Sequence, residues 1–139
     1  MKIVLDTNIF ISGIITPKGK AGKILNEYKN NALEIITSHE LLQEVKKVLN
    51  YPKIIKIIKW DQKKIDEFIE YLYFFTSIVD ITGIDYHFDQ DPNDNHIIAT
   101  YLAANCDYLV TGDKALLSLN GEFNVITLEE FITKHCLYH

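Results

Sequence analysis

The sequence contains no arginine, and all 14 residues of its Lys and Arg total are lysine. Arginine is the residue that grips phosphate and reads guanine through a planar, bidentate fork of hydrogen bonds. Any phosphate contact made by this chain must therefore use the point charge of a lysine ammonium group. Base-specific recognition through arginine is excluded.

Cysteine is scarce as well. The two cysteines, Cys106 and Cys136, belong to no CxxC or Cys/His pattern, so neither a disulfide framework nor a zinc knuckle is indicated. No hydrophobic run reaches the roughly 20 residues of a membrane span, and Asp6 interrupts the first apolar run before a signal peptide can accumulate. We therefore expect no membrane segment and a cytoplasmic location.

A chain of 139 residues with 47% hydrophobic content is near the commonest size of one compact domain, so we expect a single domain over residues 1–139. Short β-branched runs alternate with segments of helical period. The predicted strands are Lys2–Leu5, Leu33–Thr37, Ser77–Ile81, Tyr108–Thr111 and Phe123–Thr127. The predicted helices are Lys20–Asn30, His39–Asn50, Asp61–Phe74, Pro92–Asn105 and Leu128–His135, with a helical turn at Lys53–Ile58 and a loop at Thr82–Gln90. This alternation predicts an α/β fold with a mostly parallel sheet covered by helices.

The net charge of −5 hides a division along the chain. Residues 1–64 carry 12 Lys and 6 acids (+6), and residues 65–139 carry 2 Lys and 13 acids (−11), which sum to −5. The Lys-rich segment Lys46–Lys64, with Lys18, Lys20 and Lys23, would draw a polyanion toward an acidic site. The candidates for steering that polyanion are Lys18, Lys20, Lys23, Lys46 and Lys47. The alternative is that these lysines form solvated helix faces. Likewise, Tyr51 and Trp60 either stack on bases or belong to the core.

Two aspartates directly follow predicted strands. Asp6 ends the run Ile3-Val4-Leu5, and Asp113 follows Tyr108–Thr111 and Gly112. The carboxyl ends of parallel strands are where open α/β sheets bind their ligands. Either aspartate alone would be explained by a turn, but two at equivalent strand ends favour a shared site.

A third candidate, Asp94, lies in the first turn of the predicted helix Pro92–Asn105. Asp91 takes the N-cap position and Pro92 the favoured first helical position, so capping explains Asp91. Asp94 shares a face with apolar residues three and four positions later, which points it toward the sheet. The alternative for Asp94 is a favourable charge at a helix N-terminus.

The fourth candidate is Glu44, at the border of the apolar stripe of the helix His39–Asn50. Thr37 and Glu40 have the spacing of a capping box, which would explain Glu40 and leave Glu44 as the acid without a structural role. Asn8 and Thr111 would supply an amide and a hydroxyl near the same sheet edge. The five histidines have no paired nucleophile and are interpreted as surface residues.

Four carboxylates in one crevice would repel one another unless a cation were present. Oxygen ligands alone select a hard ion such as Mg²⁺ or Mn²⁺. Asp6, Glu44, Asp94 and Asp113 therefore predict a metal site that activates a water for phosphodiester cleavage.

The motifs resemble one known family. MKIVLDTNIFISGII is similar to the opening of PIN domains, SHELLQEVKKVL to their first acidic helix, and DPNDNHIIATYLAANCDYLVTGDKALLSL to the later half of their toxin branch. The resemblance covers nearly the whole chain and keeps the order of the motifs. It assigns the metal-binding acids to Asp6, Glu44, Asp94 and Asp113, with Asn8 and Thr111 as supporting groups.

This resemblance implies a three-layer α/β/α sandwich and a Mg²⁺- or Mn²⁺-dependent endoribonuclease. It further implies a homodimer and an antitoxin partner. Two other functions stay open: a phosphohydrolase that uses Asp6 as its nucleophile, and a non-catalytic binding module on the same fold. Asn8 disfavours the phosphohydrolase, since haloacid-dehalogenase-like enzymes have a second aspartate at that position.

Overall fold

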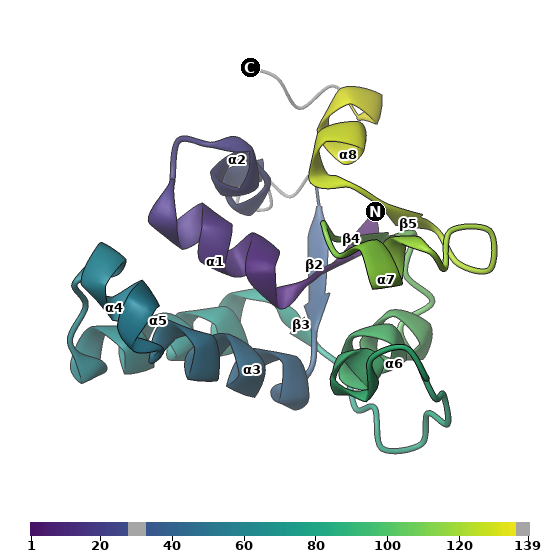
Figure 1. Ribbon diagram of the computed structural model, residues 1–139, viewed down its shortest axis with the longest axis horizontal. Coiled ribbons are helices and arrows are strands. Elements are labelled where there is room, and N and C mark those ends of the chain that lie inside the picture. Colours follow the sequence, from purple (N-terminus) through teal and green to yellow (C-terminus); the bar gives the residue numbers. More distant parts are fainter. Residues whose placement is uncertain (28–32, 136–139) are drawn as a thin grey trace.

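The computed structural model describes residues 1–27 and 33–135, which form a central sheet flanked by helices (Figure 1). All strand pairs are parallel, and the strands lie in the order β3-β2-β1-β4-β5. Their bounds are β1 Lys2–Leu5, β2 Glu34–Thr37, β3 Ser77–Ile78, β4 Tyr108–Val110 and β5 Val125–Ile126. The predicted α/β class is confirmed, and the sheet is parallel throughout rather than mostly so.

The helices of the described residues fill the gaps between these strands. They are α1 Thr7–Ile15, α2 Lys20–Glu27, α3 His39–Leu49, α4 Pro52–Ile58, α5 Gln62–Phe75, α6 Asn95–Ala103, α7 Lys114–Leu117 and α8 Leu128–Lys134. A 3-10 turn, η2, spans Pro92–Asp94 and leads into α6. The predicted end of the second helix near Asn30 lies outside the described residues.

Two helices, α1 and α7, were not predicted. The sequence of α1, TNIFISGII, is apolar on nearly every side and lacks the polar stripe that marks a surface helix. The reason is burial: Ile9, Phe10 and Ile11 all lie in the core, where α1 packs against β1, α2 and α3. The one-turn helix α7 is too short to show a period.

The order of the strands fixes where a ligand crevice forms. From β1 the chain adds β2 and β3 on one side, then crosses to the other side of β1 to form β4 and β5. This reversal between β1 and β4 is a topological switch point, where the loops that leave adjacent parallel strands diverge and open a crevice. Asp6 follows β1 and Asp113 follows β4 at that edge.

No helix in the described part of the chain has the length and apolar character needed to cross a membrane.

Candidate active site

Asp6 is held at the switch point by its backbone and its side chain. Its amide donates to the Val110 carbonyl at 3.0 Å, which extends the pairing of β1 with β4. The side chain is only 5% exposed, and its Oδ2 accepts a 2.7 Å hydrogen bond from the Thr111 hydroxyl. Burial raises the pKa of Asp6, and the Thr111 hydrogen bond opposes that rise.

Thr111 links the two strand-end aspartates. It is fully buried, and while its hydroxyl donates to Asp6, its oxygen accepts from the Asp113 amide at 3.0 Å. The Asp113 Oδ1 in turn accepts from the Ala115 amide at 2.9 Å and so caps α7. The carboxyl group of Asp113 therefore has a structural role as well as a place at the site.

Asp94 comes from the opposite wall of the crevice, at the junction of η2 and α6. One ligand oxygen from each of Asp91, Asp94 and Asp113 lies within 4.8 Å of the others. The Asp94 Oδ2 is buried and has no hydrogen-bond partner. Burial, a hydrogen bond with Asp113 and the negative charges of Asp6 and Asp91 raise the pKa of Asp94 to about 7. We call Asp91, Asp94 and Asp113 the acid cluster.

Asp91 joins the cluster although sequence reasoning had given it a capping role alone. It does cap η2, because its Oδ1 accepts from the Asn93 amide at 3.1 Å. The signal that would have found it is the spacing of three between Asp91 and Asp94, which places two acids on one tight turn.

Glu44 is half-buried on α3 and lies outside the acid cluster. Its negative charge acts on His96, whose pKa is nonetheless lowered because burial of the ring outweighs the nearby acids. The Nε2 of His96 is buried without a partner. The interpretation of His96 as a surface residue is therefore wrong; Glu44 remains a predicted ligand.

Two further expectations concern polar residues beside the acids. The capping box of Thr37 and Glu40 is wrong, because Ser38 caps α3 by accepting from the Leu41 amide at 3.2 Å. Ser38 is also hydrogen-bonded to Thr100 of α6 at 2.8 Å, which ties the start of α3 to the crevice. Asn8 is exposed in the first turn of α1, and its supporting role stays a prediction.

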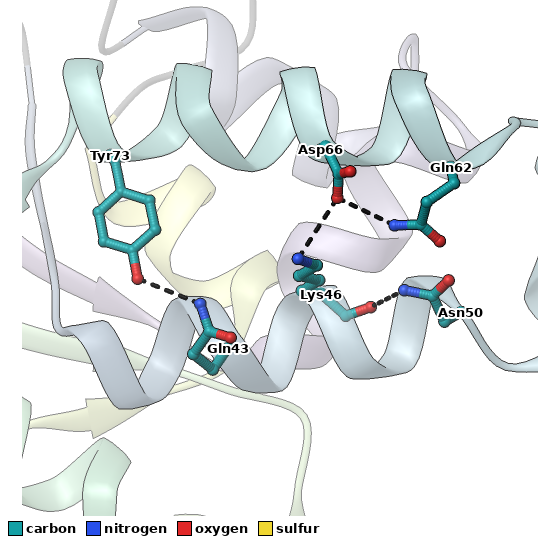
Figure 2. Close-up of polar contacts among 6 residues, drawn as sticks. All are labelled: Gln43, Lys46, Asn50, Gln62, Asp66 and Tyr73. Atoms are coloured by element: carbon teal, nitrogen blue, oxygen red, sulfur yellow. Dashed lines mark hydrogen bonds and ion pairs between the residues drawn. The ribbon is translucent and has the colours of Figure 1, made fainter.

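The lysines proposed for steering differ in their surroundings. Lys46 points from α3 toward α5 and pairs with Asp66 at 3.3 Å, and Lys20 pairs with Glu129 at 3.4 Å (Figure 2 shows the first pair). Lys18 and Lys47 are exposed, whereas Lys23 is half-buried. Two of the five lysines thus already have carboxylate partners within the chain.

A cavity elsewhere in the molecule does not contain the acids. It has a volume of about 500 Å³ and lies between α1, α2 and α5, with Phe10, Phe68 and Tyr71 among its walls. Its apolar lining offers no cluster of ionisable groups, so we locate the chemistry at the acid cluster instead.

Comparison with known proteins agrees with this geometry. The profile of the PIN domain family matches residues 2–115, which include β1, the crevice and the acid cluster. The chain belongs to the PIN domain family. The chain is also 32% identical over 124 residues to the uncharacterized protein MJ1680 of Methanocaldococcus jannaschii, a match that covers 88% of this chain and 77% of the relative.

A solved structure shows the same PIN fold. It is the crystal structure of VapBC2 from Rickettsia felis bound to a DNA fragment from their promoter. The TM-score is 0.65, the identity 16%, and the match covers 91% of this chain and 98% of the other. At this identity the likeness concerns the fold alone.

Proposed function

We propose that this PIN domain is a Mg²⁺- or Mn²⁺-dependent endoribonuclease that hydrolyses RNA phosphodiesters at the acid cluster. The observation that carries the proposal is the convergence of Asp91, Asp94 and Asp113 within 4.8 Å, with a buried Asp94 oxygen that has no partner. Carboxylates this close raise one another's pKa values, which a bound cation would reverse.

The donor set fits a hard divalent ion. Every candidate donor in the cluster is a carboxylate oxygen. The predicted further ligands are Asp6, whose charge acts on Asp94, and Glu44, whose charge acts on His96. An ion bound there supplies positive charge for the phosphate and lowers the pKa of water. Thr111 holds Asp6 through a hydrogen bond. Asn8, exposed in the first turn of α1, is the proposed supporting amide.

We further propose that the protein acts as one domain in the cytoplasm, as a homodimer and as the toxin of a toxin-antitoxin pair. The support is its family and the shared fold with VapBC2. The exposed Lys18 and Lys47 are the best placed of the five steering candidates to attract RNA, since Lys20 and Lys46 have carboxylate partners.

The test is cleavage of a labelled RNA by the purified chain. We expect cleavage with Mn²⁺ or Mg²⁺, complete loss in excess EDTA, and recovery when the metal is restored. Asp113→Asn should be inactive under all three conditions, and a DNA of the same sequence should be cut much more slowly. Cleavage that persists in EDTA would contradict the metal dependence, and activity on DNA alone would contradict the substrate.

The two alternative functions gain no support from the geometry. A nucleophilic Asp6 would need an accessible oxygen, but this side chain is 5% exposed and hydrogen-bonded to Thr111. A phosphorylated Asp6 trapped from a phosphate ester would still decide for the phosphohydrolase. A chain that binds RNA and metal without cleaving would be the binding module.

A further inference from the structure

Five lysines gather where α4 meets α5. We call Lys53, Lys56, Lys59, Lys63 and Lys64 the basic elbow. All five are exposed, and between Tyr51 and Lys64 the chain contains only one acid, Asp61. Asp61 is engaged in capping α5, since its Oδ1 accepts from the Lys64 amide at 2.9 Å. No ion pair is found at the basic elbow within residues 1–27 and 33–135, so its charge faces solvent.

Three of these lysines occupy positions that disfavour lysine locally. Lys59 ends α4 in the left-handed conformation, with φ 58° and ψ 35°, which strains residues other than glycine and asparagine. In the described part of the chain, the other non-glycine residue with positive φ is Asn105, a residue type that tolerates it. Lys63 and Lys64 stand in the first turn of α5, where the helix dipole favours acids. Positions that oppose local preference often serve a function.

The basic elbow follows the end of α3 that lies away from the acid cluster. α3 begins beside α6 through the Ser38–Thr100 hydrogen bond and runs to the start of α4, so its two ends mark the two surfaces (Figure 1). Its 11 residues span about 16 Å. A nucleic acid that touches both surfaces must therefore extend along α3.

The chemistry of the basic elbow suits a phosphate backbone rather than bases. Proteins that bind single strands combine positive charge with aromatic rings on which bases stack. At the basic elbow the Trp60 ring is covered by Lys64, at 4.8 Å, and packs against Phe68, at 5.5 Å. Among residues 1–27 and 33–135, the exposed ring nearby is that of Tyr51. Double-helical RNA is recognised through its backbone and shape, which lysine point charges match.

We propose that the basic elbow is an RNA-anchoring site that binds the phosphate backbone of a double-helical stem while the acid cluster receives an adjoining segment. This deepens, and rests on, the proposed ribonuclease function. The substrate class is then a folded RNA with a stem beside the cleaved segment.

The test is RNA binding by the full chain carrying Asp94→Asn, so that the RNA stays intact. In this background, the double variant Lys56→Gln/Lys63→Gln should lower affinity for a labelled RNA hairpin by about tenfold at 0.1 M salt. It should reduce the slope of log affinity against log salt by about 1.8, the value for two lost phosphate contacts. The matched control is Lys2→Gln/Lys134→Gln, which removes two exposed charges elsewhere and should change affinity less than twofold.

A second variant separates binding from folding. Lys59→Asn relieves the left-handed strain, so we expect its melting temperature to rise by about 3 °C while hairpin affinity falls about threefold. A fall in both the melting temperature and the hairpin affinity of Lys59→Asn would indicate a structural role and overturn the proposal. The proposal would also be overturned if both double variants lost the same RNA affinity, or if Lys56→Gln/Lys63→Gln lost as much affinity for an unstructured RNA of the same length as for the hairpin. It would likewise be overturned if this variant bound polyglutamate, an acidic polypeptide, more weakly while its RNA affinity stayed unchanged. If RNA binding follows these expectations but the parent chain never cleaves RNA, the proposed ribonuclease function is refuted and the RNA-anchoring site is still supported.

Discussion

Replacing Asp94 by Asn is expected to raise the melting temperature of the metal-free protein at pH 8 and to lower RNA cleavage at least about 100-fold. Without metal, the half-buried Asp94 carboxylate lies beside Asp113 and near the charges of Asp6 and Asp91. Asn keeps the shape and removes the repulsion. With metal, the same change deletes a hard ligand. Stability and activity should therefore move in opposite directions.

The pH dependence makes this prediction sharper. The pKa of Asp94 is raised from 3.8 to about 7, so the folded state holds a proton that the unfolded state releases. The stability tied to that proton is present below about pH 4 and is lost as the pH rises to about 7. Because water screens the charge of this partly exposed side chain, we expect a loss of about 2 kcal/mol of folding stability.

Thermal unfolding of both proteins in EDTA at pH 4 and pH 8 checks this prediction. The advantage of Asp94→Asn over the parent should be small at pH 4 and largest at pH 8. Glu122→Gln, which removes an exposed acid outside the cluster, should show no such trend. If Asp94→Asn melts well below the parent at pH 8 and still cleaves RNA with Mn²⁺, Asp94 is a structural residue and the site is misplaced.

The second large effect is expected for Thr111→Val. Valine matches the shape of threonine but leaves the buried Asp6 Oδ2 without its donor and the Asp113 amide without its acceptor. Leaving buried polar groups unsatisfied costs about 1–3 kcal/mol each, so we expect a melting temperature about 10 °C lower. Because Thr111 also orients Asp6, Mn²⁺ affinity measured by calorimetry should fall about tenfold or more.

Thr37→Val is the matched control for this variant. Thr37 is equally buried and its hydroxyl is bonded to the Thr76 hydroxyl at 2.7 Å, but neither residue touches an acid. We expect a smaller loss of stability and no change in Mn²⁺ affinity. Equal effects of the two variants on Mn²⁺ affinity would mean that Thr111 has no particular part in the metal site.

The sequence predicted the strand ends well because their signal is local. An apolar run followed by an aspartate marks the exit of a buried parallel strand, and both Asp6 and Asp113 lie there. The helix α1 escaped prediction because burial on all sides removes the amphipathic period that identifies a helix. The capping of α3 was misassigned by one residue, from Ser38 to Thr37, which is the usual uncertainty of a helix boundary.

The membership of the acid cluster could be predicted only in part. Asp94 and Asp113 were identified from their positions, but Asp91 was explained by capping and the burial of His96 was missed. Both depend on how α6 packs against α3 and β1, which is a tertiary property. A sequence pattern places residues on an element, but it does not give the distance between two elements that fold together.

The pairing of β1 with β4 also determines when the site comes into existence. Asp6 and Thr111 are bonded across 105 positions of sequence, and Lys2 is bonded to Asp107 across the same separation. A nascent chain therefore cannot assemble the crevice until β4 and Asp113 have left the ribosome. Every translation product that ends before Asp113 lacks part of the carboxylate set, so the proposed nuclease site cannot form on it.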